Sequence, residues 1–222
     1  MTNFELLVEA TSAEQQYLLG APIMQDLIDG AFDLAAYQAF LVNAYQHVRH
    51  TVPLMMSCAA RLPERLEWLR PALVEYINEE QGHEQWILDD LEVCGADVAA
   101  LRRQEPGFEV ELLVSYVYDF IERHEPIGFF GMVHVLEGTS TSIATLTAQL
   151  IQDRLGLPDS AFRYLRSHGE LDKEHVVFFE QLINQLEDSR DVAAVIHVAR
   201  RVYRLYGDVI RSVPRLESRR AA

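Results

Sequence analysis

Apolar residues recur along the chain with a period near 3.6, which is the pattern of amphipathic helices. The pattern predicts helices over residues 3–18, 21–30, 34–62, 63–94 and 108–125, and then helices opening near 126, 167 and 189. Asp33 is expected to cap the third of these, and Gly95 to end the fourth. Pro53 is expected to kink or break its helix, and Pro71 either to kink its helix or to restart it. No hairpin signal is present, so the sequence predicts one all-α domain over residues 1–222, a bundle of seven to eight helices.

Composition supports a globular protein of ordinary kind. Of 222 residues, 49% are hydrophobic and 24% are charged, which is enough for one large core. The chain has no apolar run of about 18 residues, as a membrane helix would need, and no signal-peptide core near its start. Its two cysteines, Cys58 and Cys94, are far apart and suit a reducing cytosol. We therefore expect a cytoplasmic protein without a membrane partner.

The net charge of -15 argues against nucleic acid and anionic membranes as partners, since nothing would offset phosphate repulsion. Arginines do recur at helical spacing over residues 200–220. A solvated helix face explains them most simply, and a docking patch for an acidic carrier is the alternative.

Three predicted helices carry acids and imidazoles where apolar residues are expected. In the stretch NEEQGHEQW, Glu80 and His83 are three residues apart, so they are neighbours on one helix face, with Tyr76 a turn before. Di-iron carboxylate bundles use such an ExxH pair. Glu79 could replace Glu80 in this pair. The pair alone is a weak signal, because both residue types are common on helix surfaces.

A second acid, Glu137, follows the apolar run FFGMVHVL, with His134 one turn earlier. A carboxylate there is costly to bury unless it is paired or binds a metal. A paired core acid is therefore the alternative to a ligand. The small polar run TSTS over residues 139–142 either lines a pocket or bonds back to helix carbonyls.

The third stretch, SHGELDKEH, places His168, Asp172 and His175 at relative positions 0, 4 and 7. At about 100° per residue these side chains fall within a stripe of roughly 60°. Two imidazoles and a carboxylate on one face are suited to iron or manganese. A polar, solvent-facing stripe is the alternative.

Together the three helices offer three carboxylates and three imidazoles. Three carboxylates would leave two divalent ions with one net positive charge, and open coordination positions on such ions suit O2 chemistry. A ferritin-like centre would use two ExxH pairs and two further glutamates, whereas this chain has one ExxH pair.

With these motifs the sequence resembles the haem-oxygenase-like di-iron oxidases, within the superfamily that includes thiaminase II and the PQQ-synthesis enzyme. The likeness extends over most of the chain, from APIMQDLIDGAFDLAAYQAF through EEQGHEQWILDDLEVCGAD and LEGTS to HGELDKEH. It implies a haem-oxygenase-like fold and two iron ions, or one iron and one manganese. The ligands that it implies are Glu80, His83, Glu137, His168, Asp172 and His175.

Departures separate the chain from other branches of that superfamily. Haem oxygenases need a histidine in the first helix, but the first histidine here is His47. Thiaminase II needs a cysteine in the helix of Glu137, which neither Cys58 nor Cys94 supplies. The PQQ-synthesis enzyme uses no metal.

The resemblance implies an O2-dependent oxidase or oxygenase of a small carboxylate-bearing metabolite, of amino-acid or fatty-acid type, and suggests a homodimer. A metal-free enzyme of thiaminase or PQQ type and a non-enzymatic helical binding protein are the alternatives. Candidates for substrate binding or for supporting the ligands are Tyr76, His134, His47 and His50, with helix packing as the alternative role for the last two. Asp90 could orient a ligand.

Overall fold

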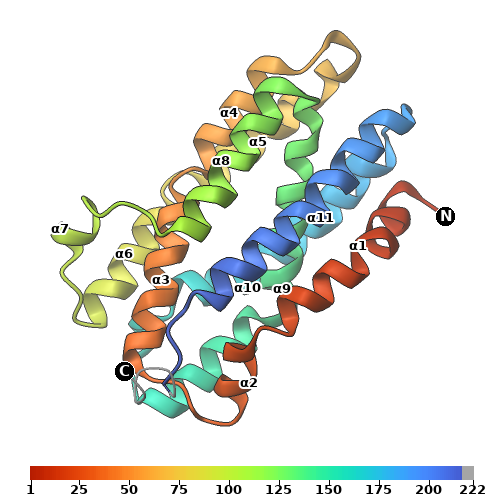
Figure 1. Ribbon diagram of the computed structural model, residues 1–222. Helices are drawn as coiled ribbons and strands as arrows, with labels where there is room; N and C mark the ends of the chain where they lie inside the picture. The colour runs from red at the N-terminus through yellow and green to blue at the C-terminus, as the bar shows by residue number, and fades with distance from the viewer. Residues whose placement is uncertain (217–222) are drawn as a thin grey trace.

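The computed structural model describes residues 1–216, except for the side chains of residues 169–174. Within that part of the chain it has eleven α-helices and three short 3-10 helices (Figure 1). They are α1 (Asn3–Leu19), α2 (Pro22–Ile28), α3 (Leu34–Val48), α4 (Thr51–Arg61), η1 (Glu64–Leu69), α5 (Arg70–Glu80), α6 (His83–Val93), α7 (Val98–Leu101), α8 (Phe108–Arg123), η2 (Pro126–Gly128), α9 (Phe129–Leu155), η3 (Asp159–Ala161), α10 (Arg163–Asn184) and α11 (Ser189–Arg211). No strand occurs among the described residues, and the all-α prediction is confirmed.

Two predicted helix boundaries are found as the capping rules require. The side chain of Asp33 accepts a hydrogen bond from the backbone N–H of Ala36, so it caps the start of α3. Gly95 follows α6 with φ of +81°, a left-handed conformation that glycine adopts without strain. Asp33 and Gly95 are therefore sufficient to predict these two helix ends from the sequence.

The prolines lie close to the points where the long predicted segments are divided into shorter helices. The break after α3 falls at Arg49 and His50, and Pro53 is the third residue of α4. A proline is tolerated there because the first-turn N–H groups lack partners within the helix. Pro71 lies in the first turn of α5, so of the two outcomes expected for it the restart is the one observed. Pro63 precedes η1 instead of opening a long helix.

The long helix α9 lies between α10 and α11, and α1 packs on the far side of α11 (Figure 1). Helices α9 and α11 come very close together at Gly131 of α9. A Cβ atom there would lie 2.5 Å from the carbonyl oxygen of Val195 and 2.6 Å from the backbone nitrogen of Ala199. The backbones of α9 and α11 therefore touch at this point, which only glycine allows.

A second group of helices completes the bundle. Helix α4 packs against α5 and α8, while α6 packs against both α3 and α10. The contact between α6 and α10 brings two of the predicted ligand stretches together. No helix of the described residues is both long and apolar enough to cross a membrane.

Candidate metal centre

Glu80 and His83 meet across a turn, whereas the sequence pattern predicts that they share one helix face. Glu80 is the last residue of α5 and His83 the first of α6. Between them Gly82 has φ of +96°, which interrupts the helix. The turn still brings Glu80 Oε2 to 3.1 Å from His83 Nδ1, and both residues are buried. The predicted contact is confirmed. The prediction that both residues lie on one continuous helix is wrong.

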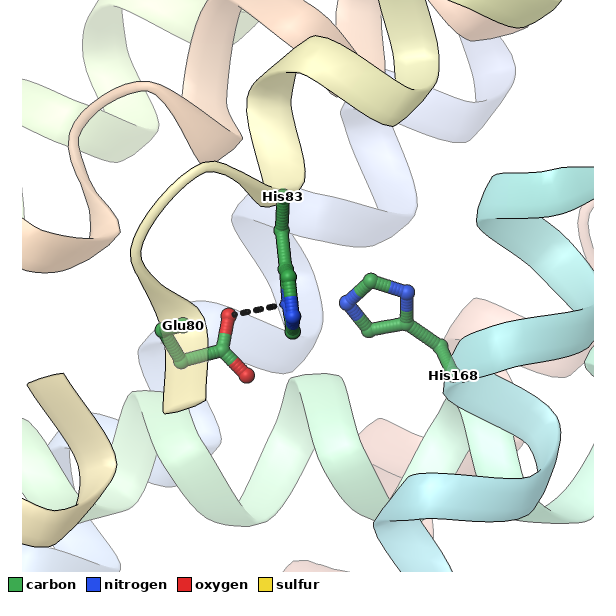
Figure 2. Close-up of side chains that lie close together, drawn as sticks. All are labelled: Glu80, His83 and His168. Carbon is green, nitrogen blue, oxygen red and sulfur yellow. Dashed lines mark hydrogen bonds and ion pairs between the residues drawn. The ribbon is translucent and has the colours of Figure 1, made fainter. Parts of the chain in front are cut away.

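His168 of α10 faces this pair (Figure 2). One ligand atom each from Glu80, His83 and His168 can be chosen so that all three lie within 4.8 Å of one another. The rings of His83 and His168 are nearly perpendicular, with centroids 4.9 Å apart. Two imidazoles and a carboxylate at this spacing form a set of donors that can bind one divalent transition-metal ion.

The orientation of His168 leaves one ring nitrogen available as a ligand. Its Nδ1 lies 2.9 Å from the carbonyl oxygen of Tyr164. Because a carbonyl only accepts, Nδ1 carries the hydrogen and donates it. In the neutral ring the lone pair is then on Nε2. Metal-bound histidines are held in the same way, through the nitrogen that does not bind the metal.

A second group of donors surrounds His175, further along α10. His175 Nε2 lies 2.9 Å from Glu79 Oε2, and its Nδ1 lies 3.6 Å from Glu137 Oε1. His175 and Glu137 are largely buried, with side chains 9% and 12% exposed, whereas that of Glu79 is 47% exposed. The ring of Tyr76 packs edge-on against His175. The two adjacent acids Glu79 and Glu80 therefore point to different histidines, an arrangement that spacing alone did not predict.

The predicted ligand Asp172 lies on α10 between His168 and His175, but its side chain is outside the described residues. Of the six predicted ligands, the structure thus places five side chains. Glu80, His83 and His168 form one group, and Glu137 and His175 belong to the other.

Electrostatics show that the two groups are close neighbours. Burial by itself would raise the pKa of the Glu80 carboxyl. The hydrogen bond from His83 and the favourable electrostatic interactions with His83, His168 and His175 outweigh this effect, so the pKa is lowered. Glu80 therefore stays an anion in a buried place, and histidines from both groups contribute to that.

The other predicted supporting residues have different surroundings. His47 is buried and lines a cavity that also reaches Glu80, Glu137 and His168. His134 packs among the rings of Phe4, Phe179 and Tyr203, and burial lowers its pKa to about 4. His50 Nδ1 lies 3.3 Å from the hydroxyl of Tyr118. Among the described residues, neither His134 nor His50 lines the cavity. His134 packs in the core, and the partly buried His50 contacts Tyr118 instead.

Asp90 holds the start of α10, the helix that carries His168. Its two carboxylate oxygens accept hydrogen bonds from the backbone N–H groups of Arg163 and Tyr164, at 3.0 and 2.9 Å. These are the first residues of α10, one turn before His168. The carboxylate of α6 thus fixes the helix that presents His168, and does not contact the imidazole directly.

The cavity beside the two groups measures about 150 Å³. Besides Glu80, Glu137 and His168 it touches mostly apolar side chains from α1, α2, α3, α9 and α11. The centre therefore adjoins a largely apolar space, where water is poorly held and a substrate could lie next to a bound metal.

Solved structures with the same fold are numerous. A protein of unknown function with a heme oxygenase-like fold from Shewanella denitrificans has a TM-score of 0.84 and 20% identity, with 96% of this chain and 92% of that chain covered. A TenA homolog from Pseudomonas syringae has a TM-score of 0.78 and 11% identity, covering 93% and 90%. Heme oxygenase-1 from Synechocystis, in complex with heme, has a TM-score of 0.73 and 13% identity, covering 95% and 91%. At such low identities the likeness shows the fold alone.

A comparison with curated proteins found none that matches the chain. The family model described as iron-containing redox enzyme, in contrast, matches residues 38–207. This range includes all six predicted ligands and most of the bundle. The chain belongs to the family of iron-containing redox enzymes, and its fold is haem-oxygenase-like.

Proposed function

We propose that this protein is an O2-dependent, non-haem di-iron oxidase or oxygenase that acts on a small carboxylate-bearing metabolite. One observation carries the proposal. Two neighbouring groups of carboxylates and imidazoles, one around His83 and His168 and one around His175, converge beside one cavity. Burying this many carboxylates and imidazoles costs folding free energy unless a cation is bound among them.

The donor set fits two iron ions. Glu80, His83 and His168 would hold one ion, and Glu137, Asp172 and His175 the other. Nitrogen and oxygen donors in this mixture suit iron, and manganese in one position would meet the same ligands. The contact between His175 and Glu79 brings together atoms that an ion could also bridge, so Glu79 is a further candidate ligand.

When bound, the irons would supply electrons and open coordination positions for O2. The chain's own residues prepare the site for this chemistry. The Tyr164 carbonyl holds the His168 ring so that Nε2 faces the centre. The apolar lining of the cavity limits access of water to the substrate. A substrate carboxylate would offset the positive charge that remains on the two ions.

Two features favour this function over the other activities on this fold. Helix α1, Asn3–Leu19, contains no histidine that could hold a haem from the first helix. Helix α9, which carries Glu137, contains no cysteine. Cys58 and Cys94 are both buried on or beside other helices, and burial raises the pKa of Cys58 to about 12. Neither thiol is prepared to act as a nucleophile.

Anaerobic titration of apo protein with Fe(II), followed by desalting and metal analysis, tests the proposal. We expect two irons per chain, followed by O2 uptake when air is admitted. His83→Ala and His175→Ala should each lose iron, while His197→Ala, an exposed histidine on α11, should keep both ions. Absence of iron uptake, or unchanged uptake in both ligand variants, would overturn the proposal in favour of a metal-free enzyme.

A further inference from the structure

Trp86 of α6 lies between the candidate metal centre and the surface of the protein. It follows His83 by three residues on the same helix, so the two side chains are neighbours. The indole and imidazole rings are stacked, with centroids 3.9 Å apart and planes 28° from parallel. His83 is buried, whereas Trp86 is partly exposed. This aromatic contact therefore joins a predicted iron ligand to a side chain that solvent reaches.

Other aromatic rings at the centre are placed differently. Among the described residues, the ring of Tyr164 lies 4.6 Å from that of His168, measured between centroids. The ring of Tyr76 lies 5.7 Å from that of His175. Tyr76 is buried and Tyr164 lines the cavity, whereas Trp86 is not among the described residues that line it. An indole that loses an electron at position 86 would therefore lie apart from a substrate in the cavity.

A positive charge also lies next to the indole. The guanidinium carbon of Arg163 is 4.9 Å from the centroid of the Trp86 ring, which is a cation–π contact. This contact holds the indole in place. A nearby like charge disfavours a cation, so an indole that loses an electron here should also release its N–H proton. The neutral indolyl radical is then the form of oxidised Trp86 that these surroundings favour.

Reaction with O2 creates a demand for electrons that such a residue can meet. Reduction of O2 to two waters takes four electrons and four protons. Two Fe(II) ions supply two electrons as they become Fe(III), and a substrate that is being oxidised supplies the other two. When no substrate is bound, the last two electrons have to come from the protein. Side chains at the centre are then at risk of oxidation.

Resting on the proposed function, we infer that Trp86 is a redox-active residue that supplies these electrons, one at a time, when O2 reacts without substrate. In each step Trp86 loses one electron to the oxidised iron centre through His83, and its indole proton goes to solvent. An external thiol then gives one hydrogen atom to the indolyl radical and restores the indole. After two steps the two thiyl radicals combine as one disulfide. Two Fe(II), one O2, two thiols and two protons thus give two Fe(III), one disulfide and two waters.

Oxidation of the protein in the absence of substrate tests this inference. Trp68→Phe leaves Trp86 as the single tryptophan of the chain. Fe(II)-loaded protein of this background is mixed with O2 and frozen at successive times, and electron paramagnetic resonance should show a transient indolyl radical. Added glutathione should abolish the accumulation of this radical, and one disulfide should form for each O2 consumed.

The site of damage is a second measurement, made on wild-type protein by peptide mass spectrometry. After exposure of the Fe(II)-loaded protein to O2 without thiol, ring oxygenation should be found at Trp86. It should be absent from Trp68, which is exposed on η1 and is therefore the matched control for a solvent-accessible indole. Zn(II)-loaded protein, whose metal cannot supply electrons to O2, should show no oxygenation at either position.

Substitutions separate electron donation from packing. Trp86→Phe keeps an aromatic ring beside His83 but replaces the indole by a ring that is much harder to oxidise. This variant should bind two irons with wild-type affinity, lose the radical, and release iron faster over repeated exposures to O2. Trp86→Tyr should restore a radical, now with a tyrosyl spectrum, and should slow the loss of iron. A role in packing alone would not distinguish tyrosine from phenylalanine at this position.

The possible failures are distinguishable. Uptake of iron and O2 without an indolyl radical, and with Trp86 unmodified, would overturn the inference and leave the proposed di-iron function in place. Equal oxygenation of Trp86 and Trp68, or of Trp86 in the iron and zinc proteins, would also overturn the inference. Absence of iron uptake would overturn the proposed function and the inference with it. The measurements on wild type and Trp68→Phe decide the matter even if Trp86→Phe binds less iron.

Discussion

Asp90 connects the helix of His83 with the helix of His168, so its removal should affect both stability and iron binding. The carboxylate is fully buried on α6 and accepts two backbone hydrogen bonds from the start of α10. Loss of a helix cap costs about 0.5–2 kcal/mol, and hydrogen bonds to a charged group contribute about 1.5–3 kcal/mol. The cost of burying the charge offsets part of these contributions. We therefore expect Asp90→Ala to lower the free energy of unfolding by about 2–3 kcal/mol.

The matched control is Asp89→Ala. Asp89 lies next in the chain and approaches the guanidinium of Arg163 at 3.6 Å, but both side chains are about half exposed. Exposed ion pairs contribute little, so this variant should change stability by less than about 0.5 kcal/mol. Urea unfolding of the apo proteins, followed by circular dichroism at one pH, measures both values.

The same substitution should weaken iron binding. Without the cap, the first turn of α10 loses its attachment to α6, and His168 lies one turn further on. Removal of a residue that supports a ligand typically lowers metal affinity by about 10–100-fold. We expect Asp90→Ala to fall in that range and Asp89→Ala to match the wild type, in a competition assay with an Fe(II) chelator.

The pH dependence gives a further check on Asp90. Burial raises the pKa of this carboxyl from 3.8 to about 6, although the two backbone hydrogen bonds oppose the shift. The folded state therefore retains a proton that the unfolded state loses. The stability due to this proton is present below pH 3.8 and is lost as pH rises to about 6, a change of about 3 kcal/mol at most. The free energy of unfolding of Asp90→Asn, relative to that of the wild type, should therefore rise between pH 4 and 6.

The reasoning on Asp90 would be refuted by wild-type stability and iron affinity in Asp90→Ala. A stability difference between wild type and Asp90→Asn that stays constant from pH 4 to 7 would refute the assigned pKa.

Three further predictions concern other parts of the bundle. Trp86 stacks on His83 with ring centroids 3.9 Å apart, so Fe(II) should quench its emission in a Trp68→Phe background, and unchanged emission at full loading would contradict the assigned ligand. Gly131→Ala should lower the free energy of unfolding by about 1–3 kcal/mol because the added methyl meets the α11 backbone. Gly138 has open space around it, so Gly138→Ala should raise the free energy of unfolding by up to about 1 kcal/mol. Equal effects of the two substitutions would disprove the close contact. Iron loading should slow amide exchange over residues 165–180, since it offsets the crowded carboxylates, and equal protection with and without iron would count against a metal on α10.

Much of the fold follows from local signals in the sequence. The 3.6 period predicts the helices, and Asp33 and Gly95 mark two of their ends as observed. The break between Glu80 and His83 was missed, because ExxH reads as continuous helix and Gly82 alone does not show a left-handed turn. The restart at Pro71 is one of the two outcomes expected, whereas the break near Pro53 falls at Arg49 and His50, because the first turn of α4 tolerates a proline.

The candidate site was predictable as a set of residues but not as a geometry. The position of Glu137 among apolar residues, and the stripe from His168 to His175, singled out helices whose side chains lie close together in the structure. The separate pairing of Glu79 with His175 depends on how α5 ends relative to α10, which is a tertiary contact. Likewise the cap from Asp90 to Tyr164 joins residues 74 positions apart, and no local pattern records it. The cavity is lined by side chains from eight helices, α1 to α5 and α9 to α11.

Diffraction at the iron absorption edge, from crystals of anaerobically iron-loaded protein, tests the central claim most directly. We predict two anomalous peaks per chain, one among Glu80, His83 and His168 and the other beside Glu137 and His175. No peak at either position, or a single iron held elsewhere, would contradict the di-iron assignment.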